Sequence, residues 1–457
     1  MMSFNLIRNR IADTSKVTQR FLSTSTASPS STKNVVVVDG IRLPFSMAST
    51  IYQNEMTVDL QRLAIQGLLT KTALDKDCID YVVCGNVIQE VKTSNIAREA
   101  AINCGLPHSV GSHTISQACI SANAAICSGA EKIMSGHANV VIAGGVESFS
   151  DVPIRLSRPL RQALITLPKA QKKGGPLGAI RHLTKLKLSD IFGLETPAIA
   201  NYTTGEVMGV SSDKLSAKFG IYREDQDEFS ARSHSLAGIA HAEGWYDDEI
   251  VPYKTTGRAE NGIKSDTTPE KLSKLRAAFV KPHGTHTAAN SSFLTDGASA
   301  SLLMDEETAL QLGYQPWAYL RDWSFKGCDP FTELLLGPTY CTADILRRNP
   351  KLSFSDVGVL EFHEAFAGQL LSNITAMGSQ TFADDHFGGN IVGDVMMEKL
   401  NTKGGSLSLG HPFGATGSRL VTTACRRLVE EEEQFAIVAA CADGGLGHAC
   451  LLERYDQ

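Results

Sequence analysis

Residues 118–146 read ACISANAAICSGAEKIMSGHANVVIAGGV, and residues 410–446 read GHPFGATGSRLVTTACRRLVEEEEQFAIVAACADGGL. Both stretches run from a loop of small residues into a helical pattern, and then into an apolar run that ends at a Gly-Gly pair. Alternation of helices with buried strands predicts an α/β architecture with mostly buried, mixed sheets. Because the same plan occurs twice, we predict a duplicated fold with two similar α/β halves. A chance match between common α/β patterns is the alternative.

The rest of the chain fits two halves separated by an insertion. Further buried strands are predicted at residues 35–38, 81–84 and 299–304, where apolar and β-branched residues run together. Residues 151–287 are richer in polar residues and poorer in strand-like runs, so we interpret them as an inserted loop domain. The predicted organisation is an N-terminal half at residues 34–150 that is completed by residues 288–310, then a C-terminal half at residues 311–457.

Composition excludes several classes of protein. The chain has 457 residues, of which 42% are hydrophobic and 20% charged, close to the average for globular proteins. The formal net charge of −6 argues against nucleic acid as the primary partner. No apolar run approaches the ~20 residues of a membrane-spanning helix. Ten cysteines in so long a chain do not make a disulfide scaffold, and no Cys/His spacing suggests zinc.

Residues 1–33 have the composition of an organellar transit peptide. They contain twelve Ser or Thr residues and five basic residues against one acid, Asp13. No apolar segment of secretory-signal length is present, and a basic, Ser-rich, acid-poor composition is typical of mitochondrial import signals. We therefore predict a mitochondrial transit peptide, with a disordered tail as the alternative.

Residues 155–189 carry nine Lys or Arg residues and no acid. Two apolar stripes of helical spacing flank Gly174-Gly175-Pro176, so two short basic amphipathic helices are predicted. The first stripe is Leu156, Leu160, Leu164 and Leu167, and the second is Leu177, Ile180, Leu183 and Leu186. Such a segment suits an anionic membrane surface. A solvated cap or a subunit interface is the alternative.

Cys119 precedes the helical pattern of the first stretch, in Ser116-Gln-Ala-Cys-Ile-Ser-Ala. A thiol at a helix N-terminus faces unpaired N–H groups, which predicts a lowered pKa and a nucleophile. A cysteine taken alone would more often be a buried structural thiol, as we interpret Cys127. His411 favours the nucleophile over the structural thiol, because the loop that carries it, residues 404–417, has five glycines that let the backbone turn tightly. A histidine held there could take the proton from Cys119.

Cys441 and His363 follow predicted strands. Cys441 comes directly after the run at residues 435–440 and could pass a proton to or from substrate carbon. His363 ends the run at residues 357–362, and its N–H could polarise a carbonyl or orient a water in an oxyanion hole. Each residue taken alone fits a structural role. Their shared placement at strand ends and loop–helix junctions is the stronger argument.

Together, these motifs resemble the thiolase family. Ser116-Gln-Ala-Cys-Ile-Ser-Ala resembles its nucleophile motif, residues 404–417 resemble its GG-x-x-x-x-GHP-x-GA-[ST]-G signature, and Cys441-Ala-Asp-Gly-Gly-Leu-Gly resembles its C-x-GGG-x-G signature. Residues 290–298 and the stretch that begins at Met208 are similar to two further family segments. The resemblance covers the chain after its N-terminal tail, and it implies the duplicated thiolase fold with a loop domain.

The resemblance implies thiolysis of 3-ketoacyl-CoA, with CoA as cosubstrate and no metal or redox cofactor. Cys119, activated by His411, would attack the 3-keto carbon, and Cys441 would protonate the acetyl-CoA enolate that leaves. One oxyanion hole would use His363, through a water, together with His411. The other would use the backbone N–H groups of Cys119 and Asp443.

Contacts with CoA are also implied, together with one departure from the family. Ser292 matches a serine that contacts the pantetheine arm, Met208 matches a residue of that channel, and Asn290 belongs to the same substrate-binding segment. The family usually has Gly or another small residue where this chain has Asp443. A carboxylate that pointed inward would oppose a developing oxyanion. We therefore predict that the Asp443 carboxylate points away or is paired with a base.

One branch of the family fits best, the β subunits of mitochondrial trifunctional enzymes of fatty-acid β-oxidation. This chain resembles the branch in three places. It has His363 where most thiolases have Asn, and its residues 288–300 and its basic insertion at residues 155–189 are also similar to the branch. The resemblance implies long-chain 3-ketoacyl-CoA thiolysis on the matrix side of the mitochondrial inner membrane. It also implies a homodimer core, an α subunit with hydratase and dehydrogenase activities, and peripheral membrane contact through the insertion.

Three alternatives share some of these features. A ketoacyl synthase of the same superfamily lacks the second cysteine, so Cys441 argues against it. An acetoacetyl-CoA thiolase shares the chemistry, but His363 and the basic insertion argue against it. A non-catalytic acyl-CoA-binding or scaffold subunit would be expected to have lost Cys119 or His411, and both are present.

Overall fold

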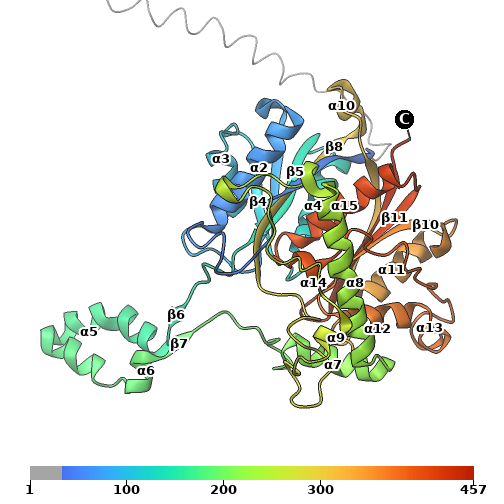
Figure 1. The fold of residues 1–457 in the computed structure, drawn as a ribbon. Helices are drawn as coiled ribbons and strands as arrows, with labels where there is room; N and C mark the ends of the chain where they lie inside the picture. Colours follow the sequence, from blue (N-terminus) through green and yellow to red (C-terminus); the bar gives the residue numbers. More distant parts are fainter. Residues whose placement is uncertain (1–32, 457) are drawn as a thin grey trace, which may run out of the picture. The chain divides into compact units, whose positions relative to one another are not determined.

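The computed structural model describes residues 33–456, so the predicted transit peptide lies outside the described residues apart from Lys33. Ten strands form one mixed sheet in the order β10-β11-β12-β9-β1-β8-β5-β3-β4, with β2 paired to β8 (Figure 1). Their bounds are β1 Val35–Arg42, β2 Ser46–Met47, β3 Tyr81–Gly85, β4 Gly111–Ile115, β5 Val140–Glu147, β8 Thr295–Asp305, β9 Ala318–Gly327, β10 Val357–Phe362, β11 Phe435–Ala442 and β12 Leu446–Arg454.

The strand pairing shows the predicted duplication. β3 and β5 are parallel, and the sheet continues from β5 through antiparallel β8 to β1. In the same way β10 and β11 are parallel, and the sheet continues from β11 through antiparallel β12 to β9. The two halves join where β1 pairs antiparallel with β9. Two α/β halves of one topology are therefore confirmed.

The two helices that follow the quoted loops pack against each other at the centre. α4 (Ser121–Met134) lies on β3 and β5, α15 (Thr416–Glu430) lies on β10 and β11, and the two helices contact each other (Figure 1). Gly129 lets α4 lie close to the sheet, because an added Cβ there would lie 2.9 Å from Cγ1 of Val141 in β5. Both loops that carry candidate catalytic residues therefore lead into one central pair of helices.

Outer helices cover the two halves. α2 (Thr57–Thr72) and α3 (Ile96–Asn103) pack on the N-terminal half, and α11 (Gly337–Arg348) packs on β9 and β12 of the C-terminal half. The other helices outside the insertion are α10 Glu306–Gln311, α12 Ala367–Met377, α13 Gln380–His386 and α14 Ser406–Leu409.

The end of β5 differs from the prediction. We expected that strand to stop before Gly144-Gly145, but β5 continues to Glu147. The glycines allow other backbone to come close. An added Cβ on Gly144 would lie 2.1 Å from the carbonyl oxygen of Ser299, and one on Gly145 would lie 1.8 Å from that of Gly414. The Gly-Gly pair therefore marks a place where the His411 loop approaches the sheet.

The segment between the halves is mostly helical. Its elements are β6 Arg155–Leu156, α5 Arg158–Leu183, α6 Leu188–Phe192, β7 Leu194–Glu195, α7 Met208–Phe219, α8 Arg223–Ala242 and α9 Pro269–Leu272. α5 is broken where predicted, because Gly174 and Gly175 have non-helical dihedral angles, with φ 58° and ψ −157° at Gly175. Leu177 and Ile180, of the second apolar stripe, are 80% and 60% exposed. Within residues 33–456, no helix is both long and apolar enough to cross a membrane.

Candidate active site

Cys119 lies in a tight turn between β4 and α4. Ala118 has φ +46°, a left-handed conformation that is uncommon for a residue with a Cβ. The Ser121 hydroxyl accepts a hydrogen bond from the Gln117 N–H (2.8 Å) and donates one to the Ala118 carbonyl (2.7 Å). The thiol is almost fully buried, with 4% of the residue exposed. The turn therefore fixes the direction of the Cys119 side chain before any substrate binds.

The expected lowering of the Cys119 pKa is wrong for the free protein. Burial raises the pKa of this thiol to about 12, and the nearby charges of Asp443 and Glu147 act in the same direction. Hydrogen bonds from the backbone N–H groups of Asp443 and of Cys119 itself lower the pKa, but burial outweighs them. A neutral thiol in such a place reacts only when a base takes its proton.

His411 is the base that the structure offers. Its Nδ1 lies 2.7 Å from the Thr416 hydroxyl, and that hydroxyl donates its own hydrogen to the Pro412 carbonyl (3.0 Å). Thr416 therefore accepts from Nδ1–H, which leaves the lone pair of the imidazole on Nε2. Nε2 is buried and has no hydrogen-bond partner among the described residues. This nitrogen is free to receive a proton.

His363 lies against His411, with ring centroids 4.1 Å apart. Its Nδ1 is 3.0 Å from the Ser406 hydroxyl, and its Nε2 is also buried without a partner in residues 33–456. His363 directly follows β10, as predicted, and its backbone N–H donates to the Ala439 carbonyl of β11 (2.8 Å). The next helix, α12, begins four residues later, at Ala367.

Burial and a neighbouring cation keep both imidazoles neutral. Burial lowers the pKa of His363 to about 3, and the charge of Arg419 lowers it further. The pKa of His411 is lowered well below its usual value by burial, then by His363 and by Arg419. Arg419 is itself buried and ion-paired with Glu361 at 3.4 Å. The site thus holds a neutral base rather than an imidazolium.

Cys441 lies near the end of β11 and is 1% exposed. Burial raises its pKa well above the usual value for a thiol, and the nearness of Cys119 adds to this rise. The fold has thus brought together two cysteines that are about 320 residues apart in the sequence. A second neutral thiol beside the first can act as a proton donor.

Two contacts hold the His411 loop in place, one with α4, the helix that follows Cys119, and one with the end of β5. An added Cβ on Gly417, at the start of α15, would lie 2.1 Å from Oδ1 of Asn123 in α4. Glu147, at the end of β5, accepts from the N–H groups of Val87, Ile88 and Gly414 at 3.0–3.1 Å. Burial raises the pKa of Glu147 to about 8. Sequence reasoning missed Glu147, although a carboxyl at the end of a buried strand could have drawn attention to it.

Asp443 occupies the turn between β11 and β12, and its side chain is half-buried. Its carboxylate Oδ1 accepts a hydrogen bond from Nδ2 of Asn201 (2.9 Å). The partner of the carboxylate is thus a neutral amide and not the base that one of the two predictions named. Asn201, in the loop domain, was not singled out from the sequence, since one asparagine in a polar loop carries no signal.

The three residues expected to contact CoA have different surroundings. Met208 begins α7, is half-buried and packs in the apolar cluster that includes Cys441 and Phe366. Ser292 is half-buried, and its N–H donates to the Ala365 carbonyl (3.0 Å). Both residues keep part of their surface exposed.

The surroundings of Asn290 differ from those expected of a residue that contacts CoA directly. It is fully buried, and its side chain bonds Asp227 (3.0 Å), the Thr285 carbonyl (3.1 Å) and the Thr287 N–H (2.6 Å). Asn290 therefore shapes the segment that presents Ser292, instead of contacting a ligand itself.

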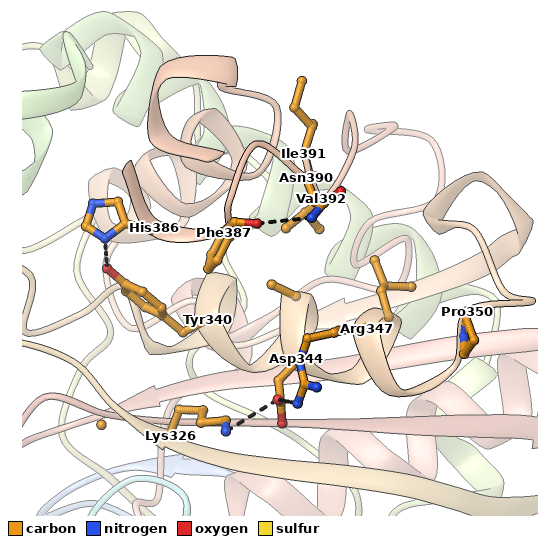
Figure 2. A pocket seen from close by; sticks show the side chains of 13 residues that line it. Lys326, Tyr340, Asp344, Arg347, Pro350, His386, Phe387, Asn390, Ile391 and Val392 are labelled. Carbon is orange, nitrogen blue, oxygen red and sulfur yellow. Dashed lines mark hydrogen bonds and ion pairs between the residues drawn. The ribbon is translucent and has the colours of Figure 1, made fainter. Parts of the chain in front are cut away.

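A separate pocket of about 650 Å³ lies away from these residues, between the end of β9, α11, α13 and residues 387–392. Figure 2 shows Tyr340 beside His386, whose Nδ1 lies 2.9 Å from the tyrosine hydroxyl. Further along α11, Asp344 pairs with Arg347 (2.7 Å) and with Lys326 of β9 (3.3 Å). None of the candidate catalytic residues lines this pocket.

The site suits the covalent transfer of an acyl group through a cysteine, so fold and site define the chain as an acyltransferase. The family follows from comparison with known proteins. Residues 35–307 match the thiolase N-terminal domain and residues 314–454 match the thiolase C-terminal domain. The chain belongs to the thiolase family.

Relatives of known name agree with this assignment. The human "Trifunctional enzyme subunit beta, mitochondrial" is 50% identical over 430 residues, which cover 93% of this chain and 89% of the relative. The "Probable 3-ketoacyl-CoA thiolase" of Caenorhabditis elegans is 48% identical, over 93% of this chain and 95% of the relative. The crystal structure of human mitochondrial 3-ketoacyl-CoA thiolase superimposes with a TM-score of 0.77 at 26% identity, over 93% of this chain and 99% of that one.

Proposed function

We propose that this protein is a 3-ketoacyl-CoA thiolase (acetyl-CoA C-acyltransferase) of mitochondrial fatty-acid β-oxidation. It cleaves long-chain 3-ketoacyl-CoA with CoA to give acetyl-CoA and a shortened acyl-CoA. The observation that carries the proposal is the free Nε2 of the neutral His411, in a buried site that also holds the two thiols Cys119 and Cys441. The named relatives support the substrate class.

In the first half-reaction, Nε2 of His411 takes the Cys119 proton, and the sulfur attacks the 3-keto carbon. Collapse of the resulting alkoxide breaks the bond between carbons 2 and 3. The longer fragment stays on Cys119 as a thioester, and the enolate of acetyl-CoA takes a proton from Cys441. A neutral, buried Cys441 thiol suits this role, because its proton is held until a strong carbanion-like base appears beside it.

In the second half-reaction, the protonated His411 first passes its proton to the Cys441 thiolate. A CoA thiol then enters and gives its own proton to Nε2 of His411, which later returns it to the leaving Cys119 sulfur. The CoA sulfur attacks the Cys119 thioester, and the shortened acyl-CoA leaves as Cys119 becomes a thiol again. The proton of the incoming CoA thiol replaces the one that Cys441 gave to acetyl-CoA, so the enzyme returns to its starting state. CoA is thus a cosubstrate. Residues 33–456 contain no cluster of three metal-ligating side chains.

Two oxyanion holes stabilise the two negative oxygens. One consists of the N–H groups of Cys119 and Asp443, which both face the Cys119 sulfur. The other uses His363, through a water, with His411. The Ser406 hydroxyl accepts from Arg419 (3.4 Å), so its hydrogen is available for Nδ1 of His363. That arrangement leaves Nε2 of His363 as an N–H donor towards the site.

The loop domain receives CoA. We assign direct contacts to Ser292 and Met208, which are half-buried near the site, and a positioning role to Asn290, whose polar atoms are all engaged. The domain boundaries proposed from the sequence, with the loop domain at residues 151–287, place α7 and α8 in this domain.

The protein acts in the mitochondrion, on the matrix side of the inner membrane, as the partner of an α subunit. Its trifunctional-enzyme relatives are named as mitochondrial β subunits, which supports the compartment and the α partner. We further assign a homodimer core, for which the edge strand β4 offers backbone groups. Membrane contact is assigned to the exposed basic helices at residues 155–189.

Thiolysis by the purified protein tests the proposal. CoA is offered with either 3-ketohexadecanoyl-CoA or acetoacetyl-CoA, products are identified by mass, and Cys119→Ser is the control. We expect cleavage of the long substrate to be strongly preferred and to be lost in the variant. A preference for acetoacetyl-CoA would keep the mechanism but overturn the long-chain assignment. No cleavage of either substrate, even with an α subunit added, would favour a non-catalytic subunit.

A further inference from the structure

Asn201 joins the loop domain to the turn that carries a proposed oxyanion donor. The residue is 5% exposed. Its Nδ2 donates to Oδ1 of Asp443 (2.9 Å), and its own Oδ1 accepts from the N–H groups of Thr203 (3.0 Å) and Thr204 (2.9 Å). The orientation of the amide is therefore determined by contacts on both its oxygen and its nitrogen.

The backbone around Asn201 forms a closed turn. The Asn201 N–H donates to the Glu206 carbonyl (2.8 Å), and the Gly205 N–H donates back to the Asn201 carbonyl (2.9 Å). An isolated bridge between Ala200 and Val207 closes the turn, and α7 starts at the next residue. These contacts restrict the position of the Asn201 side chain. The Asp443 carboxylate is therefore hydrogen-bonded to a group that has little freedom to move.

Asp443 presents two groups of opposite electrostatic effect near Cys119. Its backbone N–H faces the Cys119 sulfur, where it favours negative charge, and its carboxylate opposes negative charge. Rotation about the Asp443 Cα–Cβ bond changes the position of the carboxylate without moving the N–H. Whether this turn helps or hinders the reaction therefore depends on where the carboxylate is held.

We infer that Asn201 is a positioning residue for thiolysis. Its amide holds the Asp443 carboxylate in one orientation and donates a hydrogen bond to it, which reduces the negative charge that this carboxylate sets against an oxyanion at the N–H of the turn. The inference rests on the proposed function and deepens it, because it assigns to the loop domain a part in organising the oxyanion site. It also explains how a position usually occupied by a small residue accommodates an aspartate.

A merely structural role for Asn201, in closing its own turn, is the competing explanation. Asn201→Asp separates the two roles. An aspartate keeps the oxygen that accepts from Thr203 and Thr204, as carboxylates commonly do in such turns. It loses the N–H that binds Asp443 and places a second carboxylate beside the first. Thr204→Ala is the matched control, since the Thr204 hydroxyl accepts from the Glu206 N–H (3.2 Å) in the same turn and does not contact Asp443.

The experiment compares these variants with and without Asp443→Gly. We expect Asn201→Asp to lower kcat for 3-ketoacyl-CoA about 10-fold, less than the loss of an oxyanion donor causes, because the N–H remains. KM should change by less than about twofold, since no CoA contact is removed. In the Asp443→Gly background, Asn201→Asp should change kcat by less than about twofold, because the coupled partner is gone. Thr204→Ala should leave kcat near the wild-type value.

A second measurement does not depend on turnover. The rate at which iodoacetamide alkylates Cys119 is followed against pH, with Cys119→Ser as the blank. Asn201→Asp should move the alkylation profile to higher pH, and Asp443→Gly should abolish that shift. Equal effects of Asn201→Asp in both backgrounds, on kcat and on alkylation, would overturn the inference. If the wild-type protein cleaves no ketoacyl-CoA, the alkylation profiles still decide this inference, separately from the proposed function.

Discussion

At the scale of single residues, burial determines the chemistry of the site. Cys119 and Cys441 are neutral thiols, and His411 and His363 are neutral imidazoles, because none of them is exposed to water. The two thiols and the two imidazoles therefore form no thiolate–imidazolium ion pair before substrate arrives. Charge appears only as the reaction proceeds, where N–H groups are already in place to receive it.

Thr416 selects the tautomer of His411 that can act as a base. Its hydroxyl accepts from Nδ1–H and donates to Pro412, so Nε2 keeps its lone pair. Thr416→Val removes this partner from a buried imidazole, and we expect kcat to fall roughly 10- to 100-fold, within the range for a misplaced general base. Steady-state thiolysis measures the loss. Thr416→Ser keeps the hydroxyl and should retain most of the activity, so an equal loss in both variants would contradict this role.

Beside burial, the charge of Arg419 helps to keep the two imidazoles neutral at low pH. This charge disfavours protonation of His363 and His411, and the reaction needs His411 unprotonated. Arg419→Gln should raise the pKa of both imidazoles, so the acidic limb of kcat/KM should move to higher pH. The pH profile of thiolysis is the measurement. Glu361 still pairs with Arg427 at 2.9 Å in this variant, so the buried carboxylate is not left alone.

The matched control for Arg419→Gln is Arg419→Lys, which keeps the charge and should keep the wild-type pH profile. A common shift of the acidic limb in both variants would point to altered packing. No shift in either variant would show that burial alone keeps the imidazoles neutral.

Sequence reasoning singled out the four candidate site residues but not the residues that surround them. Cys119, His411, Cys441 and His363 have reactive side chains at element ends, which is a pattern that can be read along one chain. The partners Glu147 and Arg419 have ordinary sequence contexts. Thr416 lies inside the motif at residues 404–417, but its effect on His411, like theirs, arises from a contact that only the folded chain shows. The expected thiol pKa was wrong for the same reason, because helix position is visible in a sequence and depth of burial is not.

At the scale of elements, close backbone contacts bring the two catalytic loops together. The sequence correctly predicted the alternation of strands and helices and the break in α5, since both follow from residue periodicity and glycine. The predicted end of β5 came too early, because a sequence does not distinguish a glycine that ends a strand from a glycine that allows a close backbone contact.

Gly145 of β5 should tolerate no side chain. An added Cβ would meet the Gly414 carbonyl oxygen at 1.8 Å, and backbone cannot rotate away as a side chain can. We expect Gly145→Ala to destabilise the protein by roughly 3 kcal/mol, at the upper end of the usual cost of overpacking, and to displace the His411 loop. Thermal unfolding and thiolysis measure the two effects. Gly174→Ala is the control, since nothing lies within 4 Å of its Cβ, and equal unfolding temperatures for the two variants would refute the argument.

At the scale of the whole molecule, the basic insertion is separate from the chemistry. α5 is almost entirely exposed, with only Ala163 of the helix buried, and it packs mainly on α6. β6 and β7 pair antiparallel at its base, with Arg155 opposite Glu195 and Leu156 opposite Leu194. A segment that rests on one short strand pair can be removed without exposing the core.

Replacing residues 157–193 by a short Gly-Ser linker keeps the β6–β7 pair and removes both helices. We expect this variant to lose binding to cardiolipin-containing vesicles and to retain thiolysis in solution, because no candidate site residue is removed. The basic residues should make the binding of the intact protein weaker at high salt, since each contributes about 1 kcal/mol of attraction to an anionic surface. Vesicle sedimentation and the thiolysis assay measure the two properties. Equal sedimentation with and without the insertion would defeat its membrane role.

A subtler variant separates apolar insertion from charge attraction. Leu177→Ser with Ile180→Ser removes two large exposed side chains and keeps every basic residue, so vesicle binding should weaken at least roughly 10-fold if these side chains enter the lipid. Phe331→Ser with Val91→Ser is the matched control, because these side chains are 61% and 77% exposed elsewhere on the molecule. If both double variants bind vesicles like the intact protein, attraction is electrostatic only, and the helices rest on the headgroups instead of inserting between them.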